Sequence, residues 1–431
     1  MNQIMKSRGF LYVCLLPVFC CLVVLSSCAE TDEQDYVVWA ADQNGNDLYI
    51  LSPDGDVIEI YDGETLGGAD RPHMLWGIPP DPFVYSANTV SGNVTVLDGR
   101  TGEVVAVVEG VGKLPHAAQP NPARTEYIYV SNIGPQAAGE DGNPDFGETI
   151  SEIVRTEGPD GYSWEVTRFL DLKAEPLLAD DELFPSRRPV CAGFTPDGNY
   201  KLVTLFNGGL AVVDLGEWKV RKAWGKDQVA EHGCGFAESP VEGEIYVTAG
   251  HMHSSWLYVF DISGDEPELA ATHNLSDTGR DSHGVWIDTE RNELWVIHRV
   301  TDNATIHPLA TIRDEDHEYE VMGFVGNTPD LITMSPDNSR GFITLRGPNP
   351  APTIPHDIVG VRSGISIIDV AARELVKVVH LGDEDMVYLF RRGINKSEAS
   401  GRDYSGLTPV WFILQVKSAL LCQNLLQQHY K

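Results

Sequence analysis

A short sequence unit recurs from residue 36 to about residue 385, and this repeat constrains the fold more than any other feature. Its second copy is the clearest, because PHMLW opens it and FVYSANTVSGNVTVLDGRTGEVVAVVEG then gives three apolar or alternating runs separated by turn residues. Such runs are typical of β-strands packed between neighbouring sheets. The other openings lie at Pro115-His116, Pro189-Val190, Glu231-His232, Ser282-His283 and Pro329-Asp330.

The unit that begins at residue 36 lacks an opening motif and starts directly in the apolar run YVVW. We therefore expect the N-terminus to supply three strands of one sheet and the C-terminus to supply its innermost strand. Six full units and one shared unit make seven, and radial repetition of small sheets leaves few strand edges exposed. The sequence thus predicts an all-β, seven-bladed β-propeller of four-stranded antiparallel blades over residues 36–387, with the N-terminal strands closing the ring. Eight blades is the main alternative.

The Gly and Pro content agrees with many short strands, and the net charge limits the kinds of partner that the protein can bind. The 431 residues include 41 Gly and 26 Pro, which suits a chain with many turns. The formal net charge of −32 repels phosphate backbones, so we expect no nucleic-acid partner. The same charge attracts cations and basic partners, or simply keeps the protein soluble.

The N-terminus resembles a bacterial lipoprotein signal. Lys6 and Arg8 precede an apolar run over residues 9–25, which is short and close to the start of the chain for a membrane span. The run ends in Leu-Ser-Ser before Cys28, and this resemblance to a lipobox implies cleavage before Cys28 and lipid attachment to its thiol. An ordinary signal peptide is the alternative. We expect a signal peptide at 1–27, a lipidated linker at 28–35, and a lipid-anchored protein in the periplasm or at the cell surface, with the outer membrane favoured.

The C-terminus departs from the repeat. Residues 386–431 carry six basic and two acidic residues in an otherwise acidic chain. Residues 387–390 are one candidate for the strand that closes the ring, and we treat 388–431 as an atypical tail without an assigned function.

The repeat resembles the YVTN/YncE-like β-propeller family over nearly the whole mature chain. The resemblance rests on the runs that end in Asn88 and Asp98 and on the Thr-Gly turn that follows them. It implies a WD40-like scaffold and little about activity.

In a propeller the opening motifs and the ends of the second strands share one rim of the central channel, where such scaffolds often keep their site. Four His and one Asp occupy six equivalent opening positions. The candidate metal ligands on this rim are His73, His116, His232, His251, His253, His283 and Asp330. The candidate ligand-binding residues beside them are Cys191, Cys234, His298, Arg299 and Arg346.

Two interpretations of this rim stay open. Imidazole binds zinc or copper, and a carboxylate or thiolate completes such a ligand set. Histidine at the same opening position of several repeats also arises from repeat duplication alone. In that case each imidazole only forms hydrogen bonds with nearby backbone groups. Cys191 and Cys234 likewise either face a ligand or form a disulfide between blades.

We therefore expect a monomeric, non-enzymatic envelope protein that binds a metal ion, a small ligand or an envelope protein at the channel mouth. A periplasmic metal- or cofactor-dependent oxidoreductase that uses the same rim is the alternative. No phosphate loop, nucleophile elbow, HExxH or CxxCH motif is present in the sequence.

Overall fold

The computed structural model describes residues 36–43, 45–134, 137–138, 144–159, 161–239, 243–348, 358–382 and 415–416. The signal peptide and Cys28 lie outside these residues, as does the candidate closing segment 387–390. Among the described residues, no helix is long and apolar enough to cross a membrane.

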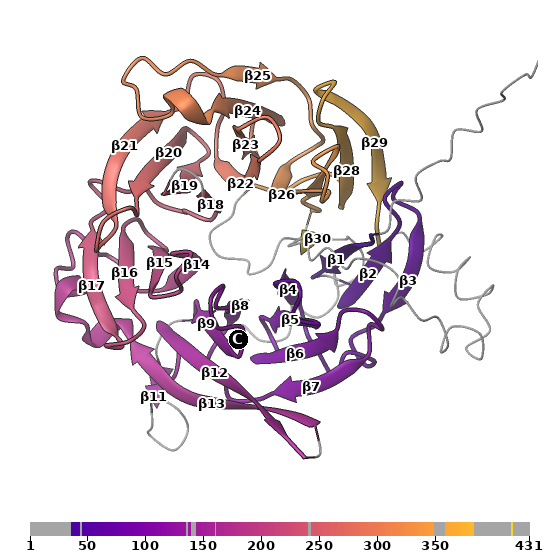
Figure 1. Ribbon diagram of the computed structural model, residues 1–431, viewed down its shortest axis with the longest axis vertical. Coiled ribbons are helices and arrows are strands. Elements are labelled where there is room, and N and C mark those ends of the chain that lie inside the picture. Colours follow the sequence, from indigo (N-terminus) through magenta and orange to yellow (C-terminus); the bar gives the residue numbers. More distant parts are fainter. Residues whose placement is uncertain are drawn as a thin grey trace, which may run out of the picture. The chain divides into compact units, whose positions relative to one another are not determined.

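Seven four-stranded sheets surround a central axis, which confirms the predicted seven-bladed β-propeller (Figure 1). Six blades are each built from a continuous stretch of chain. Blade 2 contains β4 (Pro72–Trp76), β5 (Phe83–Asn88), β6 (Asn93–Asp98) and β7 (Val104–Val108). Blade 3 contains β8 (Pro115–Pro120), β9 (Tyr127–Asn132), β12 (Thr149–Gly158) and β13 (Gly161–Asp171). Blade 4 contains β14 (Pro189–Phe194), β15 (Tyr200–Leu205), β16 (Leu210–Asp214) and β17 (Lys219–Trp224).

The second half of the ring repeats this order, with the first strand of each blade nearest the axis (Figure 1). Blade 5 contains β18 (Phe236–Ser239), β19 (Glu244–His251), β20 (Ser254–Asp261) and β21 (Glu268–Asn274). Blade 6 contains β22 (Ser282–Asp288), β23 (Glu293–His298), β24 (Asn303–Pro308) and β25 (Glu320–Met322). Blade 7 contains β26 (Pro329–Met334), β27 (Arg340–Leu345), β28 (Gly364–Asp369) and β29 (Glu374–His380).

Blade 1 joins the two ends of the propeller. The N-terminal part supplies β1 (Val38–Asp42), β2 (Asp47–Leu51) and β3 (Val57–Tyr61), and β30 (Gln415–Val416) is the fourth strand. Within this sheet β1 and β2 pair antiparallel, but β30 runs parallel to β1. The innermost strand of this blade thus comes from the segment expected to be an atypical tail.

The remaining elements lie between strands. A two-stranded sheet of β10 (Ala137–Ala138) and β11 (Pro144–Asp145) belongs to the insertion after β9. Short 3-10 helices in the described ranges are η1 (Leu172–Ala174), η2 (Pro176–Leu178) and η3 (Leu309–Thr311).

The core lies between blades, because each sheet is apolar on both faces. Trp39 of β1, for example, packs in one cluster with Leu75 of β4 and Val84 of β5. A separate cluster surrounds the axis and includes Met74, Cys191 and Leu331 from innermost strands. Burial of these apolar faces, at roughly 25 cal/mol per Å², holds the ring together without a separate core domain.

Asp54-Gly55, Asp197-Gly198 and Asp337-Asn338 lie in tight turns between consecutive strands. Gly55, Gly198 and Asn338 adopt φ values of 80°, 67° and 50°. The Asp197 carboxylate accepts hydrogen bonds from the backbone N–H of Asn199 and from the Thr195 hydroxyl, which closes the turn locally.

Candidate functional site

The opening residues sit in a repeated backbone irregularity at the start of the innermost strands. The pairing of β4 with β5 shifts register directly after Pro72, and β8, β14, β22 and β26 shift at the equivalent place. A bulge of this kind redirects the side chain of the extra residue. The preceding residue is left-handed in four of these blades, with φ of 60° at Arg71, 50° at Leu114, 59° at Asp281 and 50° at Thr328. Backbone strain therefore gathers at this mouth of the channel.

The structure brings the predicted column of His and Asp residues into contact between blades. The rings of His73 and His116 lie 4.1 Å apart between centroids. His116 Nδ1 lies 3.8 Å from Cys191 Sγ, and His283 Nε2 lies 3.5 Å from an Asp330 carboxylate oxygen. His232 instead packs against His251 of its own blade, at 4.9 Å. The predicted mouth is thus a ring of neighbouring, largely buried polar side chains.

Two buried arginines dominate the blade 6 and blade 7 side of this mouth. Arg299 donates to both oxygens of Asp281, at 2.6 and 3.0 Å, and to Asp330 at 3.3 Å. Arg346 lies 3.9 Å from Asp330 through one terminal nitrogen, while its buried Nε and Nη2 atoms have no hydrogen-bond partner among the described residues. Burial lowers the pKa of Arg346 to about 10.

The remaining predicted His residues lie in different environments. His298 points into its blade, where Nδ1 bonds to the Ser255 hydroxyl at 3.1 Å and Nε2 to the Thr305 hydroxyl at 2.9 Å. Burial lowers its pKa to about 3, so the ring is neutral. His251 is half-buried at the end of β19, and His253 is exposed in the following turn.

Cys191 and Cys234 form a disulfide, which decides between the two interpretations of this pair. The bond joins the innermost strand of blade 4 to the segment before β18 in blade 5, with 4.8 Å between the Cα atoms. These sulfurs are therefore not thiolates that could complete a metal site.

No group of three or more His, Cys, Asp or Glu side chains within the described ranges is arranged to hold a metal ion. The polar groups at the mouth instead contact one another. The geometry of the described residues thus offers no ligand set for the predicted zinc or copper ion.

A cavity of about 340 Å³ occupies the channel beyond the opening residues. Its wall comes from positions further along the innermost strands, starting at Met74, Cys191 and Leu331. The predicted His residues do not line it. Its aromatic residues are Trp76, Phe194, Phe236 and Trp286, and its polar side chains are Gln119, Glu238 and Thr289. A concave apolar wall with few polar groups is the usual form of a small-molecule site.

Gln119 and Glu238 of this wall belong to a network across three blades that also includes Lys201, which is not among the lining residues. The buried ammonium of Lys201 on β15 donates to Gln119 Oε1 on β8 at 2.6 Å and lies 4.1 Å from the centre of the Phe194 ring. The Gln119 amide nitrogen donates to the Ala192 carbonyl at 2.7 Å. Glu238 on β18 accepts the backbone N–H of Phe194 at 2.5 Å.

Burial shifts both charged groups of this network toward neutrality. It lowers the pKa of Lys201 to about 7 and raises the pKa of Glu238 to about 7. By surface area the Glu238 side chain is only half-buried, whereas desolvation is the largest cause of its raised pKa. Both observations are expected of a carboxyl group that faces a cavity. A perturbed ionisable group in a concave pocket, here Glu238, marks a candidate functional site.

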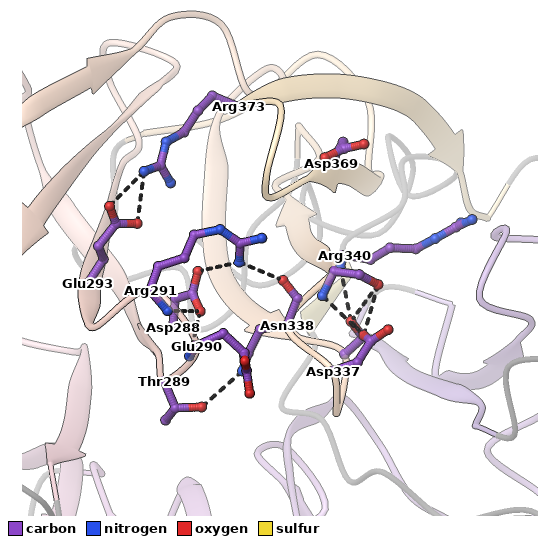
Figure 2. Close-up of polar contacts among 12 residues, drawn as sticks. Asp288, Thr289, Glu290, Arg291, Glu293, Asp337, Asn338, Arg340, Asp369 and Arg373 are labelled. Atoms are coloured by element: carbon purple, nitrogen blue, oxygen red, sulfur yellow. Dashed lines mark hydrogen bonds and ion pairs between the residues drawn. The ribbon is translucent and has the colours of Figure 1, made fainter. Parts of the chain in front are cut away.

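Near the cavity, the turn around residues 288–291 of blade 6 forms polar contacts with the turn around Asn338 of blade 7 (Figure 2). Arg291 pairs with Asp288 at 2.8 Å and donates to the Asn338 carbonyl of blade 7 at 3.2 Å. The Asn338 amide in turn donates to the hydroxyl of Thr289, which lines the cavity, at 2.9 Å. These contacts connect Thr289 of the cavity wall to the turn at Asn338 in blade 7.

The sequence interpretation singled out the first positions of the innermost strands and missed Gln119, Lys201 and Glu238. A sequence signal existed for two of them, because Gln119 and Glu238 are polar residues within the innermost runs PHAAQP and FAES. Lys201 is the second residue of an ordinary second strand, and only the packing of blades shows that it is buried.

The fold and this cavity define a β-propeller protein with a pocket in its central channel. No family profile and no curated protein matches the sequence. Among solved structures, the Kuenenia stuttgartiensis Hydrazine Synthase is similar with a TM-score of 0.52 and 13% identity, covering 83% of this chain and 99% of that one. The Myceliophteria_thermophila Cps50 (Swd1) β-propeller domain has a TM-score of 0.51 and 12% identity, covering 78% and 98%. At these identities the likeness shows the propeller fold alone.

Proposed function

We propose that the protein is a lipid-anchored protein of the cell envelope whose β-propeller binds a small molecule in the central channel. The anchor rests on the lipobox-like sequence before Cys28. Binding rests on one observation, the cavity of about 340 Å³ with Glu238 and Gln119 in an aromatic wall. This volume lies in the range of small-molecule pockets.

This proposal keeps the predicted channel and moves the ligand away from the His-lined mouth. At that mouth Arg299, Asp281 and Asp330 contact one another, and Cys191 is bonded to Cys234. In the described residues, nothing specific favours the alternative of a metal- or cofactor-dependent oxidoreductase. We therefore propose a non-enzymatic binding protein.

Ligand-observed NMR tests the proposal with a mixture of small water-soluble aromatic, cationic and anionic compounds. The variant Met74→Trp enlarges a side chain of the cavity wall in blade 2, and Leu331→Phe enlarges one in blade 7. Val321→Trp is the control, because Val321 is 47% exposed on an outer strand.

We expect magnetisation transfer to at least one compound with the wild type and with Val321→Trp, and its loss in both wall variants. Circular dichroism checks that these variants are folded. Absence of binding by the wild type, or equal binding by folded wall variants, contradicts a ligand in the cavity.

A further inference from the structure

The aromatic residues of the cavity wall surround a space with a single acidic side chain. Trp76, Phe236 and Trp286 line it together with Glu238. The faces of Trp and Phe rings attract cations, most strongly when water is excluded. A carboxylate in the same wall adds direct charge attraction, so the wall has two independent features that favour a positive group.

Glu238 has no ion-pair partner within 4.0 Å among the described residues, although it lies deep in the channel wall. Its contact is the backbone N–H of Phe194, at 2.5 Å, on one carboxyl oxygen. The neighbouring cation is Lys201, which is directed to Gln119 Oε1 at 2.6 Å and to the Phe194 ring at 4.1 Å. An unpaired carboxylate in a desolvated wall is costly unless a ligand or a proton balances its charge.

We infer that the cavity takes a compact organic cation, an ammonium or quaternary ammonium group on an apolar body, with its charge beside Glu238 and its body against Trp76, Phe236 and Trp286. The inference rests on the proposed function and names the ligand class for the same cavity. The net charge of −32 supports it, because an acidic protein raises the local concentration of cations.

This ligand class carries a proton signature. A bound cation favours the ionised form of Glu238, whose pKa burial raises to about 7, so binding near pH 7 releases a proton. Lys201 faces the same network, and a nearby cation also disfavours its charged form. Both groups therefore make the affinity for a cation rise as the pH increases through about 7. Variants of each residue separate the two contributions.

The test uses choline and its uncharged carbon isostere dimethylbutanol, which have the same shape. Choline carries a permanent charge, so any proton released comes from the protein. Isothermal titration of the full-length protein in two buffers of different ionisation enthalpy gives both affinity and proton release. The variants are Glu238→Gln, Glu238→Asp and Lys201→Met. Glu103→Gln is the matched control, since it changes the net charge equally at an exposed position.

We expect choline to bind the wild type about tenfold or more tightly than dimethylbutanol, with release of up to one proton. Glu238→Gln should lower choline affinity about tenfold, leave dimethylbutanol nearly unchanged and abolish most of the proton release. Gln still offers an oxygen to the Phe194 N–H, which favours a folded variant. Glu238→Asp and Glu103→Gln should keep the preference for choline, and Lys201→Met should keep the proton release.

Equal binding of choline and dimethylbutanol, or an unchanged choline affinity in Glu238→Gln, overturns the inference and leaves the proposed function standing. Binding of neutral aromatic compounds without choline has the same meaning. If no compound of any class binds the wild type, the proposed function fails as well.

Discussion

Arg299 and Arg346 occupy equivalent places directly after the second strands of blades 6 and 7, yet among the described residues Arg299 alone forms close ion pairs with two carboxylates. Arg299 holds both oxygens of Asp281 and also reaches Asp330. Arg346 approaches Asp330 at 3.9 Å, and within the described part of the chain two of its buried nitrogen atoms have no hydrogen-bond partner. Both guanidinium groups are buried, so their different acidic partners should give the two arginines different contributions to the free energy of unfolding.

Replacing each arginine by methionine should separate these roles. Arg299→Met leaves the Asp281 carboxylate buried without its cation and should lower the free energy of unfolding by about 3–5 kcal/mol. Arg346→Met removes a poorly compensated buried charge and should change it by less than about 1 kcal/mol, or raise it. Urea unfolding measures both, and similar losses in the two variants would contradict this assignment.

The disulfide between Cys191 and Cys234 should stabilise the junction of blades 4 and 5. It closes a loop over a sequence separation of 43 residues at the axis. The double variant Cys191→Ser and Cys234→Ser should lose about 2–4 kcal/mol of unfolding free energy. The control is the wild type under reducing conditions, which should approach the double variant. Thiol titration of the unfolded, unreduced protein should not detect Cys191 or Cys234, and detection of both would show that the bond is absent.

Stability should fall on acidification because His298 is buried and neutral. Burial lowers its pKa to about 3, whereas the unfolded chain binds a proton near pH 6.5. Its contribution is therefore complete above pH 6.5 and is lost as the pH falls from 6.5 toward 3, at up to about 1.4 kcal/mol per pH unit. Burial also lowers the pKa of His307, which adds to the same trend.

Urea unfolding between pH 4 and pH 7 measures this slope. His298→Gln should reduce the slope by about one proton. His253→Gln, at an exposed position in a turn, should leave it unchanged. An identical slope in His298→Gln would show that another group controls the acid sensitivity.

The proposed lipid anchor makes a separate prediction about Cys28. Cys28→Ser should move the protein from the membrane fraction to the soluble fraction, because lipid chains supply the membrane affinity. Metabolic labelling with a radioactive fatty acid should mark the wild type and not the variant. A soluble wild type without label would rule out the anchor and leave the cavity proposal untouched.

The blades were predictable because each one is a local sequence unit with its own strands and turns. Ring closure was predictable in outline, since the unit at residue 36 lacks an opening run. The actual closing strand, Gln415–Val416, lies in a segment without repeat character and runs parallel to β1, so no sequence pattern pointed to it.

The sequence by itself determined the β-propeller and the circle of opening residues, because both follow from periodic patterns that recur along the chain. Only the tertiary structure decided what those residues do. It paired Arg299 with Asp281, joined Cys191 to Cys234, placed Gln119 and Glu238 of two blades around one cavity, and set Lys201 of the blade between them against Gln119. The physical reason is that burial and partner choice depend on contacts between blades, which lie far apart in the sequence, whereas strand formation depends on neighbouring residues.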